Sequence, residues 1–277
     1  MRAHVDAMDA LIGVQHRVLD HGFVTLVDYM GDDDAIVQAA RVSTGSHSKS
    51  PEDDEKLIRY LMRHEHTSPF EMASIKLRMR LPIFVARQLI RHRTASVNEF
   101  SARYTKLPDV AYVPEVDQIR AQSKVNHQGS DRPIDPEVAA LTRERTIRSY
   151  HDSFATYDHN LMLGVARELA RVVTPVGTYT EWYWKIDLHN LLRTLKLRCD
   201  SHAQYEIRVY ADVLADIVRQ WVPMTYRAWV DYKRDAVTFS RPMMAYLRQV
   251  VEIEDSMNKP DGVSDREWED FRRDLGI

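Results

Sequence analysis

The chain lacks most of the features that mark the special classes of protein. Its single cysteine, Cys199, excludes a disulfide framework and suits the reducing cytoplasm, which is the location we predict. No apolar run approaches the roughly 20 residues that a membrane-spanning helix needs, and the N-terminal residues have no signal-peptide core. Only nine glycines are present, and none forms a G-x-G-x-x-G pattern after a predicted strand. We therefore expect no membrane partner and no Rossmann motif.

An excess of basic charge is also missing. The 38 lysines and arginines are outnumbered by 41 aspartates and glutamates, which gives a net charge of −3 at pH 7. Domains that bind nucleic acids carry a strongly basic surface, so we expect no nucleic-acid partner. The fragments HEH (64–66) and CDSH (199–202) are too short for a zinc pattern, and we expect no metal.

The chain does have enough apolar sequence for a packed core, since 44% of its residues are hydrophobic. Residues 73–81 alternate strictly between apolar and other side chains, which predicts a half-buried strand. Further strands are predicted at 21–30 and 178–185. Helices are predicted at 33–44, 50–66, 82–93, 136–162, 187–200 and 201–221. These elements predict an α+β fold, a single domain with a small mixed or antiparallel sheet and several long helices.

The predicted organisation along the chain is simple. Residues 1–20 are expected to be a variable leader, 21–235 the main domain, and 236–277 a helical C-terminal extension. Residues 107–135 are polar and contain three prolines, so we interpret them as a long surface excursion from the main domain.

One segment, RHRTASVNEFSARY (91–104), has no apolar period and is not explained by folding alone. It gathers Arg91, Arg93 and Arg103 around a single acid, Glu99. Arginine is suited to bidentate recognition of phosphates and carbonyl groups. On a mildly acidic chain, this local concentration of donors favours a small anionic ligand in a pocket.

The segment also carries the pattern R-H-R, seven residues, then S, which resembles the signature of the flavin-dependent thymidylate synthases. Four further blocks resemble that family in the same order: HEHTSPFE (64–71), LPIFVARQLIRHR (81–93), ARELARVVTP (166–175) and LRCDSHAQYEI (197–207). The resemblance spans about residues 21–233. It implies an enzyme, a methyltransferase that converts dUMP to dTMP. The carbon donor is methylenetetrahydrofolate, and the hydride donor is reduced FAD, which NADPH regenerates.

The resemblance also implies which residues form the site. Arg198 matches the activating, catalytic arginine. The implied dUMP contacts are Gln88, Leu89, Ile90, Arg91, Glu99, Phe100, Ser101, Ala102, Arg103, Arg171 and Arg198. The implied FAD contacts are His66, Ser68, Arg91, His92, Arg93, Glu99, Asp187, Leu188, His189, Arg193 and His202.

The chain departs from the family pattern at two of these positions. Relatives often have asparagine in place of Asp187, and asparagine or histidine in place of Arg193. Ser68 and Asp187 can also be caps of helices or turns, and both roles are compatible.

The family further implies a homotetramer with shared active sites. The matched residues form three groups, 66–71, 88–104 and 171–202, separated by long helices. A second reading is a non-catalytic nucleotide- or RNA-binding module that uses the arginine cluster. The acidic net charge and the lack of aromatic residues between the arginines argue against it.

Cys199 lies directly beside Arg198, which raises the question of a cysteine nucleophile. A lone cysteine is more often a small buried hydrophobic residue, and no family motif places a nucleophile at this position. We therefore expect Cys199 to be dispensable for the chemistry.

Overall fold

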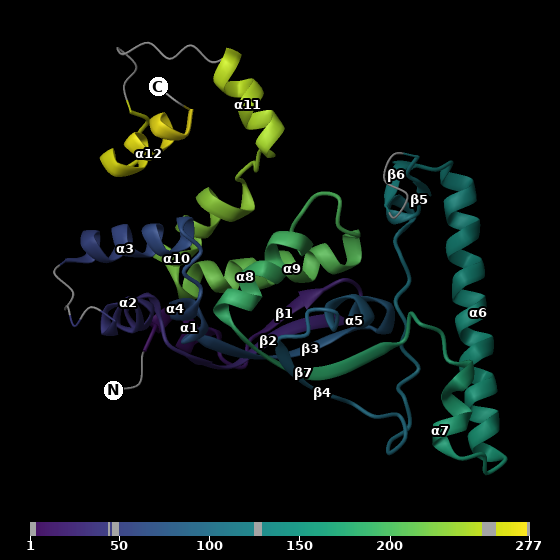
Figure 1. The fold of residues 1–277 in the computed structure, drawn as a ribbon. Coiled ribbons are helices and arrows are strands. Elements are labelled where there is room, and N and C mark those ends of the chain that lie inside the picture. The colour runs from purple at the N-terminus through teal and green to yellow at the C-terminus, as the bar shows by residue number, and fades with distance from the viewer. Residues whose placement is uncertain (1–3, 44, 46–49, 125–128, 251–258, 276–277) are drawn as a thin grey trace. The chain divides into compact units, whose positions relative to one another are not determined.

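The computed structural model describes residues 4–43, 45, 50–124, 129–250 and 259–275. The chain divides into two compact units, Met1–Arg234 and Asp235–Ile277. Figure 1 shows the elements of both units. Within the described part of the chain, no helix is both long and apolar enough to span a bilayer.

The first unit is built on a five-stranded antiparallel sheet with the strand order β1-β2-β3-β7-β4. Its strands are β1 (Gln15–Val18), β2 (Gly22–Met30), β3 (Ser74–Pro82), β4 (Ala95–Glu99) and β7 (Tyr179–Asp187). Strands β3 and β7 pair along their whole length, from Ser74 opposite Asp187 to Pro82 opposite Tyr179. The predicted α+β class is thus confirmed.

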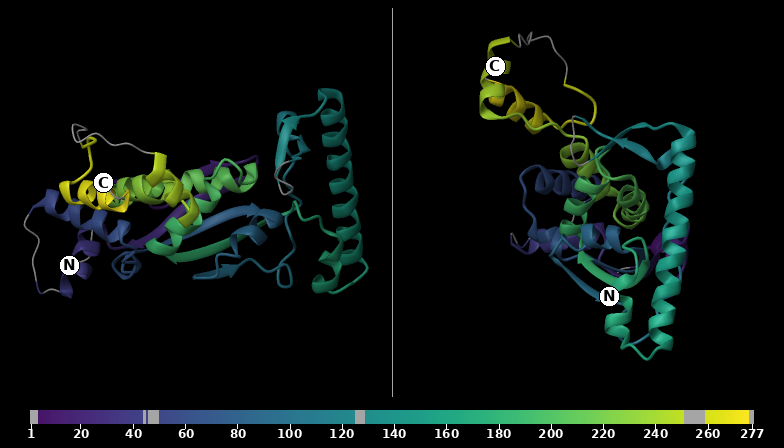
Figure 2. Two further views of the ribbon diagram at one scale, coloured as in Figure 1. Left: turned by 45° about the horizontal axis from the view of Figure 1, so that its top comes forward. Right: turned by 90° about the vertical axis from the view of Figure 1, so that its right-hand side faces the viewer.

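Three helices cover one face of this sheet: α5 (Ile83–Leu89), α8 (Leu188–Arg198) and α9 (Tyr205–Trp221). Figures 1 and 2 show them on the same side of the strands. The alternation in β3 explains this arrangement, because Ile75, Leu77, Met79 and Leu81 are all buried there. The side chains of Trp182 and Trp184, both in β7, lie in the same core.

The arginine-rich segment contains a strand that the sequence did not reveal. Ala95–Glu99 forms β4, which pairs with β7 at the edge of the sheet. The helix expected at 82–93 ends at Leu89, so the segment begins as a turn and continues as a strand. Pairing with β7 supplies the hydrogen bonds that fix this otherwise polar strand.

The N-terminal residues belong to the same unit. Residues 1–20, expected as a leader, contribute α1 (Asp6–Leu11) and the edge strand β1. Met8 is fully buried in the main core. Further helices follow at α2 (Asp33–Val42), α3 (Pro51–Arg63) and α4 (Ser68–Glu71). Ser50 caps α3: its hydroxyl accepts a hydrogen bond from the Asp53 amide at 3.2 Å.

A long helix, α6 (Pro136–Met162), stands beside the sheet and not over it (Figures 1 and 2). Asp135 caps its first turn, and the chain reverses at Gly164, whose φ is +82°. The short α7 (Arg167–Ala170) and the 3-10 turn η2 (Arg171–Val173) then fold back against α6. We call these three elements the α6 arm.

The excursion at 107–135 lies beside the α6 arm. It contains the 3-10 turn η1 (Val116–Gln118) and a two-stranded ribbon, β5 (Arg120–Gln122) and β6 (Ser130–Pro133). Residues at its start connect it to α6, because the Leu107 amide donates to the Tyr157 hydroxyl at 3.2 Å.

The second unit, Asp235–Ile277, contains α11 (Arg241–Val250) and α12 (Asp265–Leu275). Ser264 caps α12 by accepting from the Glu267 amide. Within α12, the rings of Trp268 and Phe271 stack with centroids 5.4 Å apart.

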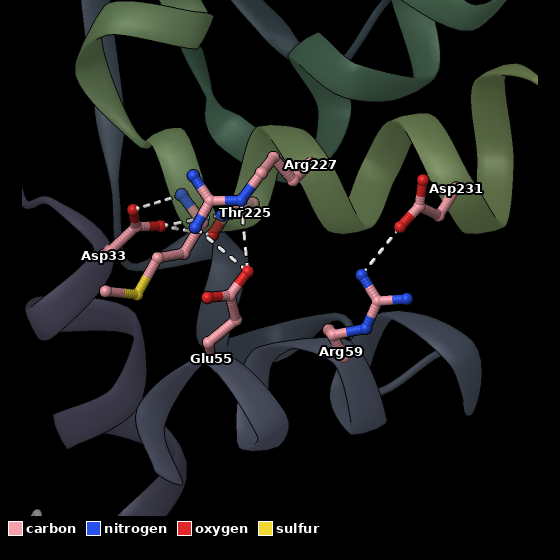
Figure 3. A network of polar contacts seen from close by, with 7 residues as sticks. Asp33, Glu55, Arg59, Thr225, Arg227 and Asp231 are labelled. Atoms are coloured by element: carbon pink, nitrogen blue, oxygen red, sulfur yellow. Dashed lines mark hydrogen bonds and ion pairs between the residues drawn. The ribbon is translucent and has the colours of Figure 1, made fainter. Parts of the chain in front are cut away.

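A polar network joins α2 and α3 to α10 (Pro223–Trp229) and to the π-helical turn η3 (Val230–Arg234), as Figure 3 shows. The Asp33 carboxylate accepts from the Met224 amide at 2.8 Å and from both the amide and the hydroxyl of Thr225. Burial raises the pKa of Asp33 above its usual value, although these donors favour the charged form. Asp33 therefore fastens the first turn of α10, whose amides would otherwise be unsatisfied.

Replacing Asp33 with alanine should therefore destabilise the first unit. We expect the Asp33→Ala variant to lose about 2–3 kcal/mol of unfolding free energy, because three donors lose their acceptor. Asp34→Ala is the matched control, since Asp34 is in the same helical turn but exposed, and should cost at most about 0.5 kcal/mol. Urea unfolding of both variants measures the difference. Equal losses would contradict this account of Asp33.

Candidate active site

A cavity of about 400 Å³ opens between the C-terminal end of α3, α4, α8 and η3. Its lining residues are Leu61, Met62, Glu65, His66, Thr67, Phe70, His189, Leu192, Arg193, Lys196, Trp229 and Lys233. Apolar side chains form part of the wall and basic side chains most of the rest, together with Glu65 and Thr67. Three residues predicted from the sequence, His66, His189 and Arg193, are thus brought together on one cavity.

The start of α8 determines which of its residues reach this cavity. Asp187 caps the helix: one carboxylate oxygen accepts from the Asn190 backbone amide at 2.9 Å, the other from the Asn190 side chain at 2.8 Å. Leu188 and the other leucines of its apolar stripe are buried against the sheet. His189, Arg193 and Lys196 are spaced i, i+4 and i+7, so they share another face of the helix. The two hydrogen bonds to Asn190 show that Asp187 does cap α8, one of the two roles considered for it from the sequence.

A strained turn places His66 on the opposite wall. Glu65 has a φ of +59°, the left-handed region that residues other than glycine seldom adopt. The His66 amide then donates to the Leu61 carbonyl at 2.9 Å, which closes the end of α3. Ser68 is the first residue of α4, but neither it nor the preceding Thr67 makes a side-chain cap there. The capping role considered for Ser68 is thus absent.

Arg198 and His92 form the central polar pair of the region. The Arg198 Nε donates to the His92 Nε2 at 3.1 Å. Burial lowers the pKa of His92, and the charges of Arg198 and Arg193 lower it further. The imidazole is therefore neutral, with its proton on Nδ1, because Nε2 must accept from a guanidinium. Burial also lowers the pKa of Arg198, which still leaves arginine a cation near pH 7.

Two glutamines connect α5 with the start of α9. The Gln88 Nε2 donates to the Gln204 Oε1 at 2.5 Å. His202, two residues before Gln204, is exposed and pairs with Asp200 at 2.9 Å. It lines a different cavity, which lies between residues 201–208 and the β5–β6 ribbon. The structure therefore does not bring His202 to the wall that carries His66.

The segment after β4 is held by contacts with β7. The Glu99 carboxylate accepts from the Thr180 hydroxyl at 2.6 Å, and the Phe100 amide donates to the Glu181 carbonyl at 2.8 Å. The Ser101 hydroxyl then accepts from the Arg103 Nε at 3.3 Å. These contacts form a turn whose polar groups face outward.

The remaining predicted residues differ in exposure. Leu89, Ala102 and Leu188 are buried, so their side chains support the fold. Ile90 and Phe100 are 44% and 38% exposed, which leaves them free to contact a ligand. Arg91 and Arg93 are exposed, and their guanidinium groups have no partner among the residues that the structure describes.

Arg171 lies in η2, and its Nε donates to the Glu168 carbonyl at 3.4 Å. Its neighbour Ala170 belongs to a small buried cluster with Ala102, Leu107 and Tyr157. This cluster brings Arg171 and the 99–103 turn to the same α6 arm. The residues predicted to bind one ligand thus form two groups within a chain: 99–103 with Arg171, and 88–91 with Arg198.

Cys199 is partly buried and packs against the main core. Burial, followed by the nearby charge of Asp212, raises the pKa of its thiol to about 12. A thiol with this pKa is not a ready nucleophile near neutral pH. No group of three or more potential metal ligands occurs in the part of the chain that the structure describes.

Sequence reasoning missed several residues of this region. Lys196 extends the stripe of His189 and Arg193 by one turn, and that spacing could have revealed it. Glu65 and Lys233 meet at 2.6 Å although they are 168 residues apart. Trp229 and Thr180 likewise reach the region only through folding.

Comparisons with known proteins support one family. Residues 25–224 match the family model described as thymidylate synthase complementing protein. The flavin-dependent thymidylate synthase of Wolbachia pipientis wMel is 49% identical over 267 residues, which cover 96% of this chain and 94% of that protein. That of Ruegeria pomeroyi is 50% identical over 265 residues, which cover 94% of this chain and 88% of that protein.

Solved structures give the same result. The UMP/dUMP methylase PolB from Streptomyces cacaoi, bound with 5-Br dUMP, superposes with a TM-score of 0.72 and is 34% identical. The match covers 79% of this chain and 99% of PolB. The same enzyme bound with 5-Br UMP gives a TM-score of 0.71.

The pair formed by Arg198 and His92 leads to a prediction for the titration of His92. Replacing Arg198 with glutamine removes a cation beside the imidazole, so the pKa of His92 should rise. The control is Arg208→Gln, since Arg208 bonds to the Ser201 carbonyl and does not act on His92. Titration of the histidine resonances by NMR measures both variants. An unchanged pKa in Arg198→Gln would contradict the pairing.

Proposed function

The chain belongs to the flavin-dependent thymidylate synthases and methylates dUMP to dTMP, and we propose that it does so with three further partners. FAD is the flavin, methylenetetrahydrofolate donates the carbon, and NADPH reduces the flavin. In this reaction carbon 5 of the uracil takes the methylene group from the folate nitrogens and loses its own proton, and the folate is released as tetrahydrofolate. The reduced flavin would supply the hydride that completes the methyl group.

One observation carries this proposal. Arg193 lines the 400 Å³ cavity and also lowers the pKa of His92, which is paired with Arg198. The cavity therefore adjoins the polar pair. A flavin in the cavity would lie next to a pyrimidine at Arg198, as hydride transfer between them requires.

The cavity fits the chemistry of a flavin. Phe70, Leu192 and Trp229 offer an apolar surface to a flat ring, while His189 and Arg193 offer donors to ring oxygens and to a diphosphate. When bound, the flavin supplies the hydride. We assign Ser68, Asp187, Leu188, Arg91–Arg93 and Glu99 to the same site, although His202 lies on another cavity. Asp187 and Arg193, the two positions at which the chain departs from the family pattern, differ in their place in the structure. Arg193 lines the cavity, whereas Asp187 caps α8.

Arg198 is the proposed catalytic residue. Its Nε is engaged by His92, and its terminal nitrogens have no hydrogen-bond partner among the described residues. They can therefore donate to the uracil at nitrogen 3 and the adjacent carbonyl. Negative charge builds on the ring as carbon 5 becomes nucleophilic, and a preorganised cation stabilises this charge without reorganisation.

The phosphate of dUMP needs several donors, and the 99–103 turn offers them. Arg103 is exposed, its Nε donates to the partly exposed Ser101 hydroxyl, and Arg171 lies on the same arm. Glu99 is positioned by Thr180 to accept from a sugar hydroxyl. Charge-assisted hydrogen bonds contribute about 1.5–3 kcal/mol each, so a few can dominate substrate binding.

Two features support a homotetramer with shared sites. The proposed dUMP residues form two separate groups in one chain, 99–103 with Arg171 and 88–91 with Arg198. In addition, the α6 arm and the residues next to it expose large apolar side chains, with Met162 and Val172 more than 80% exposed and Leu163, Leu169 and Val176 more than 60%. Such a patch is typical of a surface covered by another subunit.

The proposed co-substrates are metabolites of the cell interior, and Cys199 is a free thiol. Both support a cytoplasmic location. The relatives that match are enzymes, which leaves the reading as a non-catalytic nucleotide- or RNA-binding module without support.

Arg198→Ala should abolish most dTMP formation while the protein keeps its flavin. We expect turnover to fall about a hundred- to a thousand-fold, because this guanidinium acts on charge that forms during the reaction. Oxidation of NADPH without folate should be affected less. Arg219→Ala is the control, since Arg219 is exposed on α9 and pairs with Asp216. Near-normal dTMP production by Arg198→Ala would refute the proposed role.

Mixing inactive variants tests whether sites are shared. Arg103→Ala and Arg198→Ala proteins are mixed, their subunits exchanged, and dTMP formation assayed. If the two arginines of a site come from different chains, about a quarter of the sites in an equal, random mixture should regain both. Arg103→Ala mixed with Arg171→Ala is the control and should stay inactive, because those residues share one arm. A fully active monomer in light scattering would overturn the shared-site proposal.

A further inference from the structure

The cavity beside α8 is more basic than binding a flavin requires. His189, Arg193 and Lys196 form one row on α8, and Lys233 faces the same space from η3. Among the described residues that line it, the only acid is Glu65. Converging cations around a partly apolar pocket favour a ligand that has a flat ring and an anionic part.

Lys233 is held by an ion pair that a ligand can replace. Its Nζ lies 2.6 Å from the Glu65 carboxylate, whose side chain is 75% exposed. The hydrogen bond from Lys233 is the main cause that lowers the pKa of Glu65, and the charges of Lys233, Lys196 and His189 also contribute. Ion pairs this exposed to solvent add little stability. An anionic ligand can therefore take the place of Glu65 at small cost.

The two lysines lie beyond the positions assigned to the flavin. The proposed flavin contacts on α8 end at Arg193, and Lys196 is almost one helical turn further along the same row. Lys233 comes from a different element, η3, across the cavity. For hydride transfer, the ring of a second co-substrate must lie against the flavin. The rest of that co-substrate must then extend away from the flavin ring, and Lys196 on α8 and Lys233 on η3 are cations of the same cavity that no proposed flavin contact uses.

We propose that Lys196 and Lys233 bind the anionic tail of the second co-substrate, and that Glu65 holds Lys233 until the tail arrives. This inference rests on the proposed function. The shared chemistry is an oligoanion on a ring-bearing molecule, either the phosphates of the nicotinamide nucleotide or the glutamate carboxylates of the folate. The two lysines are thus specificity-determining residues, which select the charged form of the co-substrate over less charged analogues.

Direct binding measurements test this proposal. Flavin-loaded wild-type protein and the Lys196→Gln, Lys233→Gln and double variants are titrated in a calorimeter with NADP⁺, NAD⁺, and tetrahydrofolate with one or five glutamates. The double variant should bind the favoured oligoanion on the order of tenfold more weakly. Its affinity should also depend less steeply on salt. The change should appear in KM more than in kcat. Lys56→Gln is the control, because Lys56 is exposed on α3 and does not line the cavity.

Glu65→Gln supplies a test that misfolding cannot imitate. Removing this carboxylate frees Lys233, so affinity for the oligoanion should increase, whereas a damaged fold would decrease it. In the double lysine variant the same substitution should have no such effect.

The ligand whose affinity falls in the lysine variants shows whether the anion belongs to the nicotinamide nucleotide or to the folate. A loss for NADP⁺ but not NAD⁺ identifies the nucleotide phosphate, and a loss for the longer folate alone identifies the glutamate tail. Both results support the proposal. Unchanged affinities in variants of an active wild-type enzyme would overturn it, as would a selective loss of flavin. A flavin-loaded wild-type protein that forms no dTMP would instead refute the proposed function itself.

Discussion

The cap that Asp187 forms on α8 is the contact on which the candidate site depends. Asp187 is the last residue of β7, the strand that pairs with β3 on one side and β4 on the other. Its carboxylate binds the backbone and the side chain of Asn190, so the helix starts at one fixed residue. The leucines of α8 then lie against the sheet, and this sets the rotation of the helix. His189 and Arg193 consequently reach the cavity, while Arg198 reaches His92 eleven residues after the cap.

The same cap bears on the departure from the family pattern at Asp187. An asparagine there could both accept from a helix amide and donate to a ligand, whereas an aspartate can only accept. In this chain the amide is present in Asn190, whose Nδ2 donates one hydrogen to Asp187 at 2.8 Å and keeps a second. Asp187 and Asn190 together therefore retain the donor and the acceptor of an asparagine. The substitution is thus compatible with a polar contact at this end of the cavity.

Local sequence signals predicted the elements that have a strong internal pattern. The alternation of β3 and the capped starts of α3, α6 and α8 were all visible, because capping and periodicity are local properties. The strand β4 was not, because Ala95–Glu99 is polar and short and becomes a strand only by pairing with β7. The start of α9 was also misplaced. Ser201 does not cap it, and the helix begins at Tyr205 after a turn in which Asp200 accepts from the His202 amide.

The candidate site was predictable where its residues lie in motifs, and less so where folding brings distant residues together. The blocks around His66 and Arg91 identified the family, and the flavin contacts that the family implies include His66, His189 and Arg193 of the cavity. Lys233 lies in no such block and reaches Glu65 only because α10 and η3 pack beside α3. The sequence also could not show which predicted residues share one region. Along the chain the order is 88–91, 99–103, Arg171 and Arg198, so the members of one group lie between the members of the other. Strand β4 separates them, because it carries the 99–103 turn to the α6 arm, while His92, next to Arg91, contacts Arg198 of α8. The grouping therefore depends on a strand that only tertiary pairing creates.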